Sequence, residues 1–356
     1  MEKTRANQLQ FLRFIAFLLI CMVHTESYQP SWGPGGNGAI NAVAFFIILS
    51  GAVSGYSSYN KDIECSFKGI LLYMWKKIKK VYPLYFITTL IAVIYTDIPG
   101  LIAANEFAQT KSSVIQLLKN IFLIQSWFPE NYFSYNGVGW FLSTIMFLYI
   151  INIPLRAMAG KIRRLKNSDY IFAGVFIVTF ACVIVYCYFT QNTNTEYTQY
   201  ILPVSRTGEY VCGMALGYLA YSLTQKLQRR GIDIIIFSIL EAGAVMIWIY
   251  AMYMPIEMWQ YRIVHWLLPN CMLLMIFLFG RGIFSRLFSV SILRYLGDIS
   301  FECFLIHQLV IRQYIACGGA PAISIIGNAF SIIFCVICTV LMAGLISNAK
   351  LKNKIN

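Results

Sequence analysis

The sequence has little charge and little histidine for its length. Only 12% of its 356 residues are charged and three are histidine, whereas 58% are hydrophobic and the mean hydropathy is +0.65. A water-soluble domain cannot bury so large an apolar fraction, so this class is excluded. The chain also lacks low-complexity segments, internal repeats and any polar stretch long enough for a soluble domain. We therefore expect one domain, residues 1–356.

Apolar runs of about 20 residues recur along the whole chain, which is typical of membrane-spanning helices. They predict an all-α, polytopic transmembrane helical bundle with about ten spans, near residues 9–27, 38–57, 81–97, 138–158, 170–189, 200–222, 232–251, 260–280, 292–314 and 322–347. An arginine interrupts the first run and no small-residue cleavage site follows it. We therefore expect this span to stay as an anchor rather than to be removed as a signal peptide.

The basic residues gather on one side of the predicted bundle. With a cytoplasmic N-terminus and ten alternating spans, the inner segments hold every Lys and Arg except Arg13, Lys111, Lys119, Arg206, Arg262 and Arg312. This bias is typical of cytoplasmic loops and predicts that both termini are cytoplasmic. The net charge of +13 then reflects topology. The lipid bilayer is the expected partner, and a nucleic acid is not.

The ten cysteines indicate neither a disulfide framework nor a metal site, because most of them fall within predicted spans. Cys335 and Cys338 have C-x-x-C spacing, but they lie in an apolar run with no second pair and no histidine nearby. Small apolar packing residues are the better interpretation. We therefore expect no bound metal.

Arg13 and His24 are the first candidate functional residues, because ionisable side chains are costly within a membrane and usually serve a function there. They are eleven residues apart. On an α-helix this spacing returns to within roughly 20° of the same direction over a rise of about 16 Å. Both side chains should lie on one helix face, near opposite ends of the hydrocarbon layer. Glu26 follows His24 and is a candidate to orient it.

Lys77 and Lys80 lie in a basic stretch at the predicted cytoplasmic surface, three residues apart on an expected amphipathic helix. Two interpretations remain open for them. They serve as a stop-transfer cluster at the lipid headgroups, or they clamp the phosphates of an anionic cytosolic ligand.

Other polar residues are predicted to lie within the outer half of the bundle or near its centre. His24, His265 and His307 would converge on one leaflet, Arg206 and Glu209 would pair at i, i+3, and Glu302 would lie near the middle of its span. A shared polar cavity is one interpretation, and hydrogen bonds or salt bridges between helices are the other. The long external segment 98–137 is either a lid or acceptor-binding surface, or an interfacial helix with an aromatic belt.

Several segments together resemble the membrane acyltransferase type 3 family, whose bacterial members acetylate surface polysaccharides. Arg13 and His24 match its R-x10-H motif, and four further segments resemble its signatures in the expected order: Phe45–Gly51, Gly139–Ser143 with Trp140, Ser205–Gly217 with Arg206, and Leu296–His307. The family usually has R-x-x-R where this chain has Lys77 and Lys80. Positive charge is kept there, but bidentate geometry is lost.

The resemblance implies an O-acyltransferase in the bacterial cytoplasmic membrane. Acetyl-CoA or another acyl-CoA would bind near Lys77, Lys80 and Arg206, and Arg13 would guide its thioester arm outward. His24 would act as general base on a hydroxyl of an extracytoplasmic glycan or lipid-linked sugar. Trp140, Glu209, Glu302 and His307 would line the cavity. Direct transfer and a covalent acyl-histidine both remain open.

Two alternatives come from other functional classes. A polysaccharide transporter or flippase would also need a charged cavity between helices, although neither inverted repeats nor paired broken helices are visible in the sequence. A catalytically inactive sensor module is the other alternative, and the presence of Arg13, His24 and Arg206 argues against it.

Overall fold

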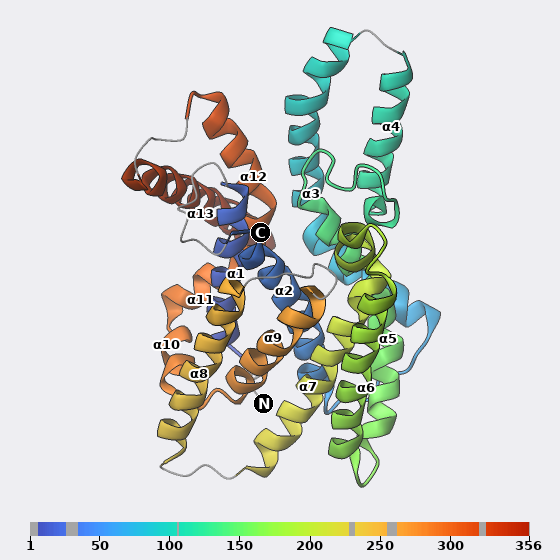
Figure 1. Ribbon diagram of the computed structural model, residues 1–356, viewed down its shortest axis with the longest axis vertical. Helices are drawn as coiled ribbons and strands as arrows, with labels where there is room; N and C mark the ends of the chain where they lie inside the picture. The colour runs from blue at the N-terminus through green and yellow to red at the C-terminus, as the bar shows by residue number, and fades with distance from the viewer. Residues whose placement is uncertain are drawn as a thin grey trace.

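The computed structural model describes residues 6–25, 35–104, 107–227, 232–254, 262–319 and 325–355. Within these ranges the chain is helical and has no strand (Figure 1). The elements in chain order are α1 Gln8–His24, α2 Gly35–Ser58, α3 Phe67–Ala104, α4 Phe107–Ile121, η2 Gln125–Trp127, α5 Gly139–Arg163, α6 Ser168–Phe189, η3 Glu196–Ile201, η4 Pro203–Arg206, α7 Thr207–Lys226, α8 Asp233–Tyr253, α9 Arg262–Phe279, α10 Ile283–Phe288, α11 Ser291–Asp298, α12 Ser300–Ala316 and α13 Ile325–Ile355.

The all-α membrane architecture agrees with the expectation. Among the described residues, six helices are long and apolar enough to cross a membrane: Asn37–Ser58, Phe67–Tyr95, Gly139–Arg163, Ser168–Phe189, Asp233–Tyr253 and Ala329–Lys350. Two shorter helices, Gln8–His24 and Val264–Phe279, are also apolar. The structure therefore supports a multi-pass helical bundle.

The structure corrects the expected bounds of two spans. The third begins at Phe67 rather than near residue 81, because α3 continues through the lysine-rich stretch. Long lysine stems allow this, since they lie along the helix while their charges reach water. The ninth predicted span is divided into α11 and α12, which meet at Ile299. The sequence pattern does not mark this break, because the apolar residues of the short amphipathic α11 run on into α12.

The centre of the bundle is the contact between α2 and α7. Glycines allow the two backbones to meet closely. A Cβ atom added to Gly213 would lie 2.1 Å from the carbonyl oxygen of Ile48, and one added to Gly217 would lie 2.1 Å from that of Ala52. Small residues at such crossings let membrane helices gain van der Waals contact without a hydrophobic driving force.

The outer surface of the bundle is strongly apolar. Large side chains on α6, α8 and α13 remain exposed, including Ile177, Ile239, Met246, Leu341 and Leu345. Contiguous apolar surface of this extent does not persist on a soluble monomer. It fits a bundle whose outer face contacts lipid.

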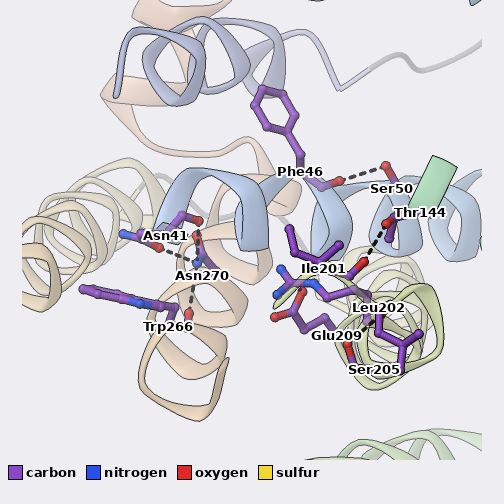
Figure 2. Close-up of polar contacts among 11 residues, drawn as sticks. Asn41, Phe46, Ser50, Thr144, Ile201, Leu202, Ser205, Glu209, Trp266 and Asn270 are labelled. Atoms are coloured by element: carbon purple, nitrogen blue, oxygen red, sulfur yellow. Dashed lines mark hydrogen bonds and ion pairs between the residues drawn. The ribbon is translucent and has the colours of Figure 1, made fainter. Parts of the chain in front are cut away.

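Buried polar groups join helices inside this apolar surface. Asn270 on α9 donates hydrogen bonds to backbone and side-chain oxygens of Asn41 on α2 and to the Trp266 carbonyl, which Figure 2 shows. Glu241 on α8 accepts hydrogen bonds from the Gly282 and Ser285 amides, both at 3.1 Å, at the start of α10. A carboxylate at a helix N-terminus satisfies free N–H groups and interacts favourably with the helix dipole.

The close α2–α7 contact gives a stability prediction. Gly213→Ala should destabilise the bundle by about 1–3 kcal/mol, because the new methyl group meets backbone that cannot move aside cheaply. The thermal unfolding midpoint in detergent should fall by several degrees. Gly243→Ala on α8 is the matched control, since its added Cβ atom meets no atom within 4 Å. Equal midpoints for the two variants would contradict the packing account.

Candidate active site

Arg13 and His24 belong to one continuous helix, α1, so their predicted relation along one face holds. His24 is the last residue of α1 and its side chain is exposed. Arg13 is partly buried, donates a hydrogen bond to Gln10 Oε1 at 2.9 Å, and lies within electrostatic range of Tyr149 on α5. Glu26, the expected neighbour of His24, lies outside the described residues.

Two consecutive residues of α12 contact His24. The His307 ring lies against it, with 5.2 Å between the ring centroids. The Gln308 amide nitrogen is 3.1 Å from both His24 Nδ1 and His24 Nε2. An atom equidistant from both ring nitrogens at this range lies over the imidazole face. The amide therefore packs on the ring and reaches either nitrogen by a small rotation.

His307 is fully buried and is fixed by its own helix. Its Nδ1 is 2.7 Å from the Phe304 carbonyl oxygen, which can only accept, so Nδ1 carries a proton. Its Nε2 is buried without a hydrogen-bond partner. The Phe17 ring packs edge-on at 5.7 Å. His307 is thereby held in place beside His24 at the end of α1.

Asn136 and Gly137, in the segment before α5, pack against α12 beside Gln308. Asn136 donates hydrogen bonds to Thr88 Oγ1 at 3.0 Å and to the Leu305 carbonyl at 2.9 Å, which ties the segment to α3 and α12. A Cβ atom on Gly137 would lie 3.0 Å from Gln308 Oε1, itself buried without a hydrogen-bond partner. Glycine at position 137, which has no Cβ atom, therefore leaves space for the Gln308 side-chain amide.

Of the three histidines, only two meet. His24 and His307 form the contact described above, whereas His265 on α9 packs on Trp266 with ring centroids 4.8 Å apart. The polar site at the end of α1 is therefore built from α1, α12 and the segment before α5.

A second polar cluster lies between α3 and α5. Lys77 on α3 turns inward, with Nζ 4.8 Å from the Tyr149 ring centroid and 5.3 Å from that of Tyr73. Arg156 on α5 lies within electrostatic range of Lys77, and its Nε is buried without a hydrogen bond. Lys80 is exposed, so the two lysines differ in environment although they lie on nearby turns.

A buried amide completes this cluster. Asn152, one turn before Arg156, accepts hydrogen bonds from the hydroxyls of Ser54 on α2 and Tyr210 on α7, the latter at 2.7 Å. Its amide nitrogen Nδ2 is buried without a close partner, within side-chain reach of the Tyr73 hydroxyl. Within the described ranges neither Lys77 nor Arg156 forms an ion pair with a carboxylate, so the two cations suit an anionic ligand. We call Tyr73, Lys77, Tyr149, Asn152 and Arg156 the basic cluster.

Arg206 and Glu209 form the expected i, i+3 pair, with 2.8 Å between Arg206 Nη2 and Glu209 Oε2 and both side chains buried. Figure 2 shows Glu209 beside the η4 turn, where Ser205 donates to the Leu202 carbonyl. Arg206 also lies over the Tyr200 ring, 5.2 Å from its centroid, and Trp140 packs on that same ring at 4.9 Å. Trp140, Arg206 and Glu209 are thus brought together, apart from the basic cluster.

Glu302 lies on α12 and forms an ion pair with Lys350 on α13 at 2.9 Å. Its carboxylate therefore joins two helices. The spacing of these residues along the chain gave no signal for the pair, because they are 48 positions apart on different helices.

Sequence reasoning missed Gln308, Asn136, Asn152 and Arg156. Gln308 follows directly after the histidine of a recognised motif, but its contact with His24 spans 284 positions and no local pattern encodes it. Arg156 was read only as part of the inner basic loops. Asn136 and Asn152 carried no charge that would have drawn attention within apolar surroundings.

Of three comparisons with known proteins, the comparison with protein families found a match. Residues 7–347 match the family model described as "Acyltransferase domain", of acyltransferase type 3. No curated protein and no solved structure matches the chain. The family match covers nearly the whole sequence and includes both the His24 site and the basic cluster. The chain therefore belongs to the acyltransferase type 3 family and is a membrane acyltransferase.

Proposed function

We propose that this membrane acyltransferase moves an acyl group, acetyl by preference, from cytosolic acyl-CoA to a hydroxyl of an extracytoplasmic glycan or lipid-linked sugar. The observation that carries the proposal is the arrangement along α1. Arg13 on this helix lies within electrostatic range of Tyr149 in the basic cluster, and the helix ends in an exposed His24 that contacts α12. A donor site and an acceptor site on opposite halves of the bundle are what transfer across a membrane requires. Sidedness follows from the charge distribution, with the bacterial cytoplasmic membrane as the location.

The basic cluster is our proposed donor site. The Lys77 ammonium and the Arg156 guanidinium would hold the donor phosphates, and the amide nitrogen of Asn152 would donate to a carbonyl of the pantetheine arm. Lys80, which is exposed, would meet the donor at the rim. Arg13 continues this line of donors along α1 towards His24. Arg206 is buried in an ion pair with Glu209 and lies over the Tyr200 ring, so we assign it to positioning Tyr200 and Trp140 instead.

At the acceptor end His24 is our proposed general base. Its imidazole takes the proton of the acceptor hydroxyl as that oxygen attacks the thioester carbonyl carbon. The carbon–sulfur bond then breaks, and the leaving thiolate receives the proton back from His24. Gln308 keeps the ring oriented throughout, because its amide donates to a neutral ring nitrogen and, after rotation, accepts from a protonated one. Glu26 remains a prediction as a further orienting group.

His24 tests the proposal first. His24→Ala should lower acyl transfer about 100-fold or more, because the general base is lost. The measurement is base-labile acetate on polysaccharide from a host without its own O-acetylation, together with release of free coenzyme A thiol. His265→Gln is the control and should retain activity. Equal acetate from wild type and His24→Ala would remove His24 from the mechanism. Altered glycan export with no acetate from either protein would favour a transporter.

Lys77 and Lys79 provide a matched pair for the donor site. Lys77 points into the basic cluster, whereas Lys79 is exposed on the same stretch of α3. Lys77→Met should raise the KM for acyl-CoA about tenfold, as expected for loss of one charge-assisted contact, while Lys79→Met should leave it unchanged. Lys77→Arg should restore most of the affinity. Equal effects of the two methionine variants would indicate general surface charge instead of a defined site.

Gln308 is predicted to be a positioning residue. Gln308→Leu should lower kcat about tenfold, since the imidazole loses its polar contact. In Gln308→Glu the carboxylate stabilises the imidazolium, so the acidic limb of the pH–rate profile should move to higher pH. His307 and Arg312 are the other titratable groups that the structure places near His24. Gln313→Leu, on the exposed side of the same helix, is the control. A wild-type pH profile in Gln308→Glu would refute the assignment.

A further inference from the structure

His307 is a buried imidazole that takes no part in the transfer steps given above. Its Nδ1 donates a hydrogen bond to the Phe304 carbonyl oxygen at 2.7 Å, one turn back on α12. That bond fixes the tautomer, so Nε2 carries a lone pair and can only accept a hydrogen bond. The side chain is fully buried, and Nε2 has no hydrogen-bond partner. His307 therefore presents a buried acceptor that lacks a donor.

Packing alone does not account for a histidine at this position. The ring has aromatic neighbours, with Phe17 edge-on at 5.7 Å and Phe304 at 6.0 Å between ring centroids. A phenylalanine would fill the same space and leave no polar atom unpaired. A buried acceptor without a donor instead loses its hydration and gains no bond in exchange. The unpaired nitrogen thus points to a hydrogen bond that His307 makes when the protein works.

The amides beside His307 use their own donors elsewhere. Asn136 donates from Nδ2 to Thr88 Oγ1 and to the Leu305 carbonyl, and its Oδ1 is itself an unpaired acceptor. Gln308 Oε1 is another unpaired acceptor, while the Gln308 amide nitrogen lies over the His24 ring. The His24 imidazole has one N–H in its neutral form, so it can supply the missing donor.

His24 lies within reach of this acceptor. The centroids of the two imidazole rings are 5.2 Å apart, and the rings are inclined at 43°. Ring nitrogens project beyond the centroid, so turning the two edges towards each other brings nitrogen to nitrogen at about 3 Å, a normal hydrogen-bond distance. His24 is the last residue of α1 and its side chain is exposed, so a side-chain rotation is sufficient.

Helix packing sets the position of His307 relative to His24. Phe17 and His24 are seven residues apart on α1, about two turns, and both contact the His307 ring. Arg13 lies one turn before Phe17 on the same face. α12 therefore packs across the face of α1 that carries Arg13 and His24, with His307 at the contact. A group held between two helices is placed more precisely than one on a loop.

We propose that His307 is the positioning residue that orients His24: His307 Nε2 accepts a hydrogen bond from one ring nitrogen of His24, which leaves the lone pair of the other nitrogen facing the acceptor hydroxyl. The hydroxyl proton moves to that lone pair as its oxygen attacks the thioester carbon, and it passes to the thiolate when the carbon–sulfur bond breaks. His307 neither gains nor loses a proton. The inference rests on the proposed function for its catalytic meaning, whereas the bond between the rings does not depend on catalysis.

Nitrogen NMR on the full-length protein in nanodiscs tests the bond between the rings. The chain has three histidines, and His265→Gln removes the one that packs on Trp266, so ¹⁵N-histidine labelling then reports on His24 and His307. At neutral pH we expect a proton on His307 Nδ1 and a coupling through a hydrogen bond between His307 Nε2 and a His24 nitrogen. A His307 Nε2 without that coupling would overturn the inference.

Two variants of similar size separate orientation of His24 from packing. His307→Gln keeps an acceptor oxygen near the place of Nε2, whereas His307→Met fills the space without one. We expect kcat for acyl transfer to fall about tenfold or more in His307→Met, with the KM for acyl-CoA unchanged, and to be largely retained in His307→Gln. The acidic limb of the pH–rate profile should move to lower pH in His307→Met, because the imidazolium of His24 loses an acceptor. Arg312, the other charged group placed near His24, stays the same in both variants.

Equal kcat in His307→Gln and His307→Met, or an unshifted acidic limb in His307→Met, would overturn the inference. Thermal unfolding midpoints of the two variants in detergent check that both fold, and where His307→Met does not fold, the nitrogen coupling decides. The coupling together with absent acyl transfer by the wild-type protein would overturn the proposed function and leave the bond between the rings standing.

Discussion

The low dielectric of a membrane bundle is the constraint on which this structure depends, since every buried polar group there needs a partner. Most find one between helices, as Asn270 does with Asn41 and Glu241 with Ser285. Some buried polar atoms of the described residues do not. They include Asn152 Nδ2 in the basic cluster, His307 Nε2 and Gln308 Oε1 beside His24, and atoms elsewhere in the bundle such as Arg206 Nε and Glu209 Oε1. Unpaired groups of this kind are where a ligand or a neighbouring side chain can supply the missing contact.

One helix, α1, carries both Arg13 and His24. Arg13 lies within electrostatic range of Tyr149 and His24 contacts α12, and the separation of Arg13 from His24 is set by the geometry of α1. Elsewhere in the bundle, glycines let α2 and α7 pack closely. In the mechanism we propose, the protein would not need to carry a whole acyl-CoA across the bilayer, because only the acyl end would have to reach His24.

The sequence was sufficient for the parts of the fold that are periodic. Apolar runs located the helices, and the spacing of Arg13 and His24 gave their shared face. The Arg206–Glu209 pair was also predictable, because both partners lie within one turn. The start of the third span was predicted too late, because the lysine stretch was expected to form a separate amphipathic helix at the surface, whereas it continues as part of α3.

Contacts between distant positions could not be predicted in the same way. Gln308 meets His24 only because α12 packs beside α1, and Lys350 reaches Glu302 only because α13 packs beside α12. The ring contacts of Tyr132 with Phe133 and Tyr197 depend on irregular segments, one of which has rare positive φ angles at Asn131 and Tyr135. No periodicity in the sequence marks such segments.

The central claim is that donor and acceptor are used from opposite sides of the membrane. Inverted membrane vesicles that hold the host glycan inside, supplied with radiolabelled acetyl-CoA outside, test it directly. The account predicts label on the enclosed glycan without lysis and none when His24 is replaced by alanine. Label that appears only after the vesicles are opened, so that donor and acceptor share one side, would contradict it.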